Sequence, residues 1–117
     1  MNTIHQFDIW FASLPMREDS HVQGGRRPVI IVSNDAANKY SPIVSVVPLT
    51  SKVRKRCLPT HVSLCAAGLP VRSLALCKQM TVIDKRQLAN RVGMVSDPFD
   101  RAAINRAMAV QLGMAAA

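Results

Sequence analysis

Short apolar runs, each ended by proline, glycine or a cluster of polar residues, occupy most of the first two-thirds of the chain. They cover residues 7–14, 28–33, 43–49 and 59–64, with a weaker run at 73–80. Their branched and aromatic residues are typical of strands, so we predict one strand for each run. Pro28 is compatible with this prediction because the first position of a strand needs no backbone donor.

The segments between the first three runs are polar. Residues 16–25, MREDSHVQGG, are predicted to form a loop that is longer than a hairpin needs, and long loops in compact domains are often functional. Residues 34–42 are predicted to form a turn.

Helix signals begin at residue 84. Asp84 and Gln87 have the spacing of a capping box, which predicts a short helix with Gly93 as its stop. A last strand at 91–95 also fits this segment.

A second, longer helix is predicted to begin at Asp97 and Pro98 and to end at Gly113. Its buried stripe is expected to contain the apolar residues at helical spacing, which are Ile104, Ala107, Met108 and Leu112. Five or six short strands followed by a terminal helix predict a mainly β fold with a C-terminal helix, either a small antiparallel barrel or a curled sheet.

Length and apolar content bound the class of protein. With 117 residues, 49% of them apolar, the chain is predicted to be a single domain, 1–117, with a proper core. No apolar run approaches the roughly 18 residues that span a bilayer, and the N-terminus lacks the layout of a signal peptide. We therefore expect a cytoplasmic protein.

Three cysteines, Cys57, Cys65 and Cys77, are an odd number and form no CxxC pair. This pattern argues against a disulfide framework and against a zinc knuckle, so no metal site is expected. We expect the three thiols to be reduced and mostly in the core.

The charge balance indicates a polyanionic partner. The chain has 15 Lys and Arg against 7 Asp and Glu, a net charge of +8, and an excess of this size binds phosphates through many weak contacts. A soluble protein that is merely basic is the alternative. The positive residues gather in two predicted loops, at Arg26 and Arg27 and again at Lys52, Arg54, Lys55 and Arg56.

Several motifs in order resemble the MazF and PemK toxins of bacterial type II toxin–antitoxin systems, from residue 8 to about residue 113. They are DIW (8–10), QGGRRPVIIVSND (23–35), NKYSP (38–42), VPLTS (47–51), LPTHV (58–62) and SLALCKQMTVIDKRQL (73–88). The resemblance implies a small SH3-like β-barrel that forms a homodimer. It also implies cleavage of single-stranded RNA at short sequences without metal or other cofactor, opposed by an acidic, MazE-like antitoxin encoded separately.

Metal-free cleavage of RNA has defined requirements. The ribose 2′-hydroxyl attacks the neighbouring phosphate, so the enzyme must align the backbone, assist proton transfer and stabilise charge on the phosphoryl oxygens. A guanidinium suits the last task because its planar fork binds two oxygens and keeps its charge. The resemblance implies that Arg27, directly before the proline, is the catalytic arginine. Gly24, Gly25 and Arg26 complete a predicted phosphate clamp at the start of a buried strand.

The second catalytic position implied by the resemblance is Thr50, whose hydroxyl can donate to a phosphate oxygen; the alternative is a threonine that closes a turn. Ser51 is a weaker candidate for the same contact. Many relatives carry an acidic residue before the Gln-Gly-Gly, and here His21 and Val22 stand there. We hypothesise that His21 partly replaces the carboxylate as proton acceptor, against the alternative of a solvated loop histidine.

Further residues are expected to bind RNA. They are Gln23, Gly24, Gly25 and Arg26 before the strand, Ser51, Lys52, Arg54, Lys55 and Arg56 after Thr50, and Arg86. The basic run directly follows Thr50, so we assign it to phosphate contacts that position RNA rather than specify its sequence.

Two other functions on the same fold stay open at this point. One is a gyrase-poisoning toxin of the CcdB type, against which the RRP and PLT residues argue. The other is a non-catalytic RNA-binding module, which the missing carboxylate leaves open. A homodimer would carry twice +8, or +16, which favours an acidic antitoxin segment with apolar anchors.

Overall fold

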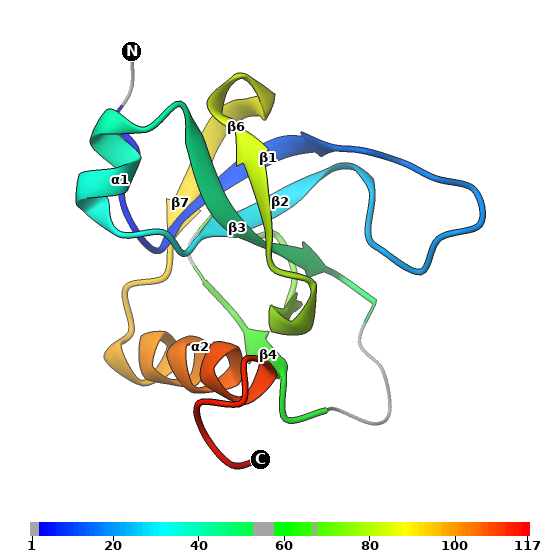
Figure 1. The fold of residues 1–117 in the computed structure, drawn as a ribbon, viewed down its shortest axis with the longest axis vertical. Helices are drawn as coiled ribbons and strands as arrows, with labels where there is room; N and C mark the ends of the chain where they lie inside the picture. The colour runs from blue at the N-terminus through cyan, green and yellow to red at the C-terminus, as the bar shows by residue number, and fades with distance from the viewer. Residues whose placement is uncertain (1–2, 53–57, 67) are drawn as a thin grey trace.

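The computed structural model describes residues 3–52, 58–66 and 68–117 (Figure 1). Short strands and helical turns alternate, and a longer helix follows them. In chain order the elements are β1 (Asp8–Leu14), β2 (Gly25–Ile31), α1 (Asp35–Tyr40), β3 (Ile43–Thr50), β4 (His61–Leu64), β5 (Ser73–Leu76), η1 (Cys77–Gln79), β6 (Thr81–Asp84), η2 (Lys85–Gln87), β7 (Leu88–Met94) and α2 (Pro98–Gln111).

The sheet is antiparallel and curled. Its strand order is β4-β5-β3-β2-β1-β7, and β6 pairs with β3. β3 is long enough to serve two strands on one edge, because residues 43–46 pair with β6 whereas residues 49–50 pair with β5. The turn η2 joins β6 directly to β7, yet no ladder among the described residues closes the sheet. The predicted mainly β fold is confirmed, in the form of an unclosed curled sheet.

Two hydrophobic clusters fill the two faces of this sheet. One contains Trp10, Val29 and Val46 and lies inside the curl. The other contains Ile9, Ile30 and Val47, which alternate with the first set along the strands, and it extends to Ile104 of α2. Figure 1 shows α2 below the curled sheet, beside β4. The fold thus consists of a curled sheet with a helix packed on its outer face.

The prediction for α2 is confirmed at both ends and wrong at one buried position. Asp97 caps the helix by accepting the backbone N–H of Phe99 at 2.8 Å, and Gly113 follows it at a φ of +72°. Ile104 and Ala107 are buried as expected. Leu112 follows the last helical residue, Gln111, and is 61% exposed.

Residues 34–42, predicted as a turn, contain the short helix α1. Asn34 caps it by accepting the backbone N–H of Ala37 at 2.9 Å. Asn38 is buried and donates to the carbonyl of Ser33 at 2.8 Å. Six residues are too few for a helix to be stable alone, so the cap and the buried Asn38 side chain help to hold it.

Two later segments also differ from the prediction. The expected strand 73–80 divides into β5 and the 3₁₀ turn η1, and a separate strand, β6, begins at Thr81. The capping box of Asp84 and Gln87 is present as predicted, but the turn it opens is three residues long. β7 therefore begins at Leu88 rather than at residue 91.

Phe7 lies outside β1 and has a φ of +71°, a left-handed conformation that costs a residue with a side chain about 1–2 kcal/mol. Its ring is buried beneath the Arg101 guanidinium, whose central carbon lies 4.9 Å from the ring centroid. Its backbone donates to Ile31 at 2.7 Å and accepts from Val95 at 2.9 Å. These contacts hold the strained conformation at the entry to β1.

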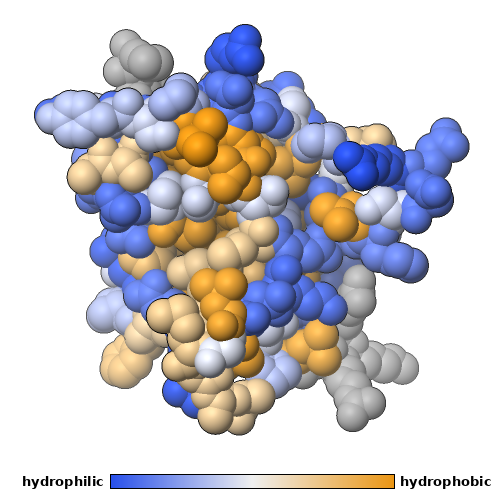
Figure 2. Space-filling model, viewed as in Figure 1, coloured by the Kyte–Doolittle hydropathy of each residue, from blue (hydrophilic) through white to orange (hydrophobic). Residues whose placement is uncertain are grey.

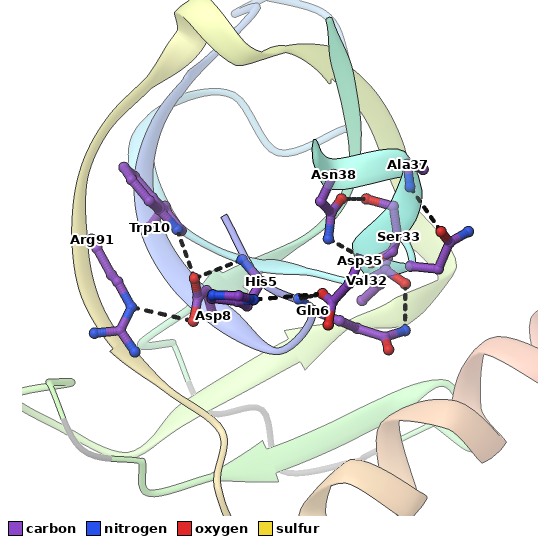
Figure 3. A network of polar contacts seen from close by, with 11 residues as sticks. His5, Gln6, Asp8, Trp10, Val32, Ser33, Asp35, Ala37, Asn38 and Arg91 are labelled. Atoms are coloured by element: carbon purple, nitrogen blue, oxygen red, sulfur yellow. Dashed lines mark hydrogen bonds and ion pairs between the residues drawn. The ribbon is translucent and has the colours of Figure 1, made fainter. Parts of the chain in front are cut away.

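A buried carboxylate organises the same turn (Figure 3). Asp8 Oδ2 accepts the backbone N–H of His5 at 2.9 Å and the indole N–H of Trp10 at 3.4 Å. Asp8 Oδ1 lies 3.2 Å from Nε of Arg91, which makes an ion pair although the two atoms are not aligned as a hydrogen bond. The N-terminal turn, β1 and β7 therefore share one charged centre.

The cysteines only partly follow the prediction. Cys77 is a buried free thiol, and burial raises its pKa to about 12. Cys65 is also free but exposed, so it is not a core residue; Cys57 lies outside the described residues. Within the described ranges, no helix has the length and apolar character needed to cross a membrane.

Candidate active site

The pairing of β2 with β3 brings the two predicted catalytic residues together. Val29 lies opposite Pro48 in the antiparallel ladder, and continuing that register by two residues along each strand places Arg27 opposite Thr50. Both residues line one open groove of about 390 Å³, together with Arg26, Ser51 and Lys52. We call this surface the Arg27 groove; it is also lined by Leu69, Pro70 and Val71.

The Arg27 guanidinium is fixed by two backbone carbonyls. Nε donates to the carbonyl of Gly24 at 3.0 Å, and Nη1 donates to the carbonyl of Leu49 at 3.3 Å. The side chain is half-buried, and the resulting desolvation lowers the pKa of Arg27; an arginine nevertheless stays charged at neutral pH. A guanidinium has five N–H donors, so three are left for a ligand in the groove.

Two glycines make this arrangement possible. Gly24 is buried, and a Cβ there would lie 2.4 Å from the carbonyl oxygen of Pro15 and 2.9 Å from the Cα of Met16. Gly25 begins β2 at a φ of +79°, which residues with a side chain rarely adopt. The loop can therefore close tightly against Pro15 and Met16 directly before Arg27.

Thr50 closes a turn and also faces the groove. Its Oγ1 accepts the backbone N–H of Lys52 at 3.2 Å, which is the turn contact that sequence reasoning held as the alternative. A hydroxyl that accepts one bond still has its own hydrogen to donate. The turn contact orients Thr50 without using that hydrogen.

Exposed positive charges border the groove. The guanidinium carbon of Arg26 lies 5.7 Å from the centroid of the Phe11 ring, within the range of a cation–π contact. Lys52 is exposed at the groove, as is Ser51. The predicted RNA-binding residues Arg54, Lys55 and Arg56 lie outside the described residues.

A second cavity, of about 310 Å³, lies under the loop at residues 15–24 and is called the loop cavity here. Its lining includes Leu14, Gln23, Gln79 and Gln87. Gln23 therefore lies here rather than in the Arg27 groove, and its backbone N–H donates to Oε1 of Gln79 at 2.7 Å. Gln79 was missed by sequence reasoning because it falls inside the predicted strand 73–80, where no local signal distinguishes it.

Two other predicted residues lie apart from the Arg27 groove. His21 is exposed in the loop and lines neither cavity. Arg86 is exposed on η2 and forms an ion pair with Asp84 at 3.4 Å; it does not line the groove. The structure thus brings Arg26, Arg27, Thr50, Ser51 and Lys52 together, with Gly24 and Gly25 behind them.

Known proteins resemble this chain in sequence and in fold. Residues 5–112 match the family model of the PemK-like, MazF-like toxin of type II toxin–antitoxin systems. A curated relative, the endoribonuclease MazF of Staphylococcus saprophyticus, is 36% identical over 109 residues, which cover 92% of this chain and 89% of that protein.

Solved structures share the fold. An endoribonuclease from a mycobacterial species has a TM-score of 0.77 at 26% identity, covering 97% of this chain and 95% of its own. A mycobacterial endoribonuclease in complex with its cognate antitoxin has a TM-score of 0.78 at 26% identity, covering 96% and 97%. The fold of MazF from Deinococcus radiodurans matches with a TM-score of 0.81 at 23% identity, covering 97% and 100%. The chain belongs to the family of PemK-like, MazF-like toxins of type II toxin–antitoxin systems.

Proposed function

We propose that this toxin is a sequence-specific endoribonuclease that cuts single-stranded RNA without a metal ion and leaves 2′,3′-cyclic phosphate and 5′-hydroxyl ends. The observation that supports this most directly is that the Arg27 guanidinium and the Thr50 hydroxyl line one groove beside exposed cations. The name of the Staphylococcus saprophyticus relative, an endoribonuclease, is consistent with the proposal.

In the proposed reaction, the 2′-oxygen of one nucleotide forms a bond to the adjacent phosphorus while the bond to the 5′-oxygen of the next nucleotide breaks. The 2′-hydroxyl loses its proton and the leaving 5′-oxygen gains one, so the reaction consumes no water in this step. The free N–H donors of Arg27 bind the phosphoryl oxygens, where negative charge increases in the transition state. The hydroxyl of Thr50 donates to the same phosphate and holds it in line for attack.

His21 is the proposed proton acceptor. An imidazole titrates near neutral pH, which suits removal of the 2′-proton. Its exposed position outside the groove means that the loop must carry it toward the bound ribose for this role. The alternative, a solvated loop histidine, needs no such movement.

A cleavage assay tests the proposal. Purified protein is incubated with long single-stranded RNA and excess chelator, and the product ends are identified. Replacing one preorganised donor at a developing charge typically costs about 10²–10³ in kcat, so we expect losses of that order for Arg27→Lys and for Thr50→Val. Arg106→Lys, at an exposed arginine of α2, is the matched control and should cut normally.

Three results would contradict the proposal. Cleavage that chelator abolishes would remove its metal-free chemistry. Inhibition of DNA supercoiling without RNA cleavage would favour a gyrase poison. Binding of RNA without cleavage would favour a non-catalytic module.

The proposed partners are a second copy of the chain and an acidic antitoxin. A mycobacterial relative has been solved with its cognate antitoxin, and the net charge of +8 here favours a negatively charged partner. Figure 2 shows a band of apolar residues down the middle of one face, with hydrophilic residues on both sides. β6 and the C-terminal segment lie toward the viewer in Figure 1 and contain exposed apolar residues, among them Val82 and Met114. This band supports a homodimer interface.

A further inference from the structure

The end of the loop at residues 15–24 is tied to a segment far away in the sequence. Gln79, half-buried, accepts the backbone N–H of Gln23 through Oε1 at 2.7 Å. The bond fixes the chain one residue before Gly24. Both glutamines line the loop cavity.

The position of Gln79 is set by the core rather than by the loop. It ends the turn η1, whose first residue, Cys77, is buried and donates its backbone N–H to the carbonyl of Thr60 at 3.0 Å. Two residues after Gln79, Thr81 pairs with Val46 of β3. The acceptor atom is therefore held on rigid elements, which position a functional group better than loops do.

The fixed end of the loop in turn holds Arg27. Gly24 is packed against Pro15 and Met16, and its carbonyl accepts the N–H at Nε of Arg27 at 3.0 Å. The second support of the guanidinium, the carbonyl of Leu49, is more distant at 3.3 Å. If the end of the loop shifted, Arg27 would keep only this longer bond and could rotate in the groove.

We propose that Gln79 is a positioning residue for Arg27. It acts through the backbone N–H of Gln23 and the carbonyl of Gly24, and the proposal rests on the proposed RNA cleavage. Misplacement of a catalytic group by about 1 Å can cost roughly 100-fold in rate. Loss of the Oε1 acceptor should therefore lower kcat, whereas KM should change little because Arg26 and Lys52 still bind the phosphates.

The experiment compares Gln79→Met, which keeps the length but removes the acceptor, with Gln79→Glu, which keeps an acceptor oxygen. Gln87→Met is the matched control, because Gln87 lines the same cavity but bonds Asp84 and Ser13 instead of the loop end. We expect kcat to fall about 10- to 100-fold in Gln79→Met and to recover within about threefold of wild type in Gln79→Glu. Gln87→Met should keep its kcat even where its thermal midpoint falls.

Coupling to Arg27 is tested in the same assay. Lysine has no Nε, so in an Arg27→Lys background Gln79→Met should lower kcat by less than about threefold further, since residues that act as a unit are not additive. The NMR signal of the Arg27 Nε–H, assigned by its loss in Arg27→Lys, reports the bond to Gly24 whether or not RNA is cut. It should shift or broaden in Gln79→Met and persist in Gln79→Glu.

The outcomes separate the two proposals. A wild-type protein that cuts no RNA would refute the proposed function, and the NMR signal would then decide the role of Gln79 alone. A wild-type protein that cuts RNA while Gln79→Met keeps its kcat would refute the positioning role. So would an unchanged Arg27 Nε–H signal, or equal losses of kcat in Gln79→Met and Gln79→Glu.

Discussion

The two partners of the ion pair between Asp8 and Arg91 are expected to differ strongly in how much stability their replacement costs. The Asp8 side chain is 1% exposed, whereas that of Arg91 is 43% exposed. Arg91→Met leaves a buried carboxylate without a counter-charge, and breaking a buried pair in this way costs about 3–5 kcal/mol. Asp8 keeps its bonds to His5 and Trp10, so the lower end, about 3 kcal/mol, applies.

Asp8→Asn should cost less. The asparagine oxygen can still accept from His5 and Trp10, and the half-exposed Arg91 can turn to water. The loss combines the difference between charged and neutral hydrogen bonds, about 1 kcal/mol, with about 1 kcal/mol for the buried amide NH₂ that replaces Oδ1 and has no acceptor. In the Asp8→Asn background, Arg91→Met should therefore cost less than about 1 kcal/mol, because no buried charge is left without a partner.

Urea denaturation at pH 7 measures these free energies of unfolding, at one fixed protein concentration because a dimer would make stability depend on it. At roughly 4 °C per kcal/mol for a domain of this size, Arg91→Met should also lower the melting temperature by about 12 °C. Equal costs of Arg91→Met in both backgrounds would show that the carboxylate does not depend on Arg91 and would refute the reasoning.

Three further predictions concern the site and the proposed dimer. If His21 is the proton acceptor as proposed, His21→Ala should change the profile of kcat against pH; an unchanged profile would remove His21 from the chemistry. A second variant replaces the basic run with glutamine at Lys52, Arg54, Lys55 and Arg56. It should flatten the salt dependence of RNA binding without altering the sequence that is cut. An unchanged salt slope would contradict the assignment of this run to phosphate contacts. Val82→Glu places a charge at an exposed apolar residue of β6 and should raise the dissociation constant of the proposed dimer at least tenfold in sedimentation experiments. Val71→Glu, at an exposed valine of the Arg27 groove, should not.

Local patterns in the sequence predicted the strands well because branched and aromatic runs bounded by proline and glycine are strong signals. They failed where tertiary contacts decide. The helix α1 depends on the buried Asn38, which no periodicity indicates. The break between β5 and β6 has no proline or glycine to mark it, because the anchoring of Cys77 in the core creates it.

The candidate site was likewise predictable from local sequence only in part. The motif before Pro28 and the threonine after Leu49 were visible as sequence, and the resemblance to a toxin family gave them roles. That Arg27 and Thr50 lie side by side depends on the register of β2 with β3, which local sequence does not determine. The contact between Gln79 and Gln23 joins residues 56 positions apart, so only the fold reveals it.

The left-handed backbone at Phe7 has a consequence for how the molecule comes apart. Glycine would adopt this φ without strain, but it would leave Arg101 with no ring beneath it. The chain instead keeps a strained backbone at Phe7, whose aromatic side chain connects the N-terminal turn to α2. Detaching α2 exposes that ring and removes the reason for the strained conformation, so the two ends of the polypeptide are expected to unfold as one cooperative unit.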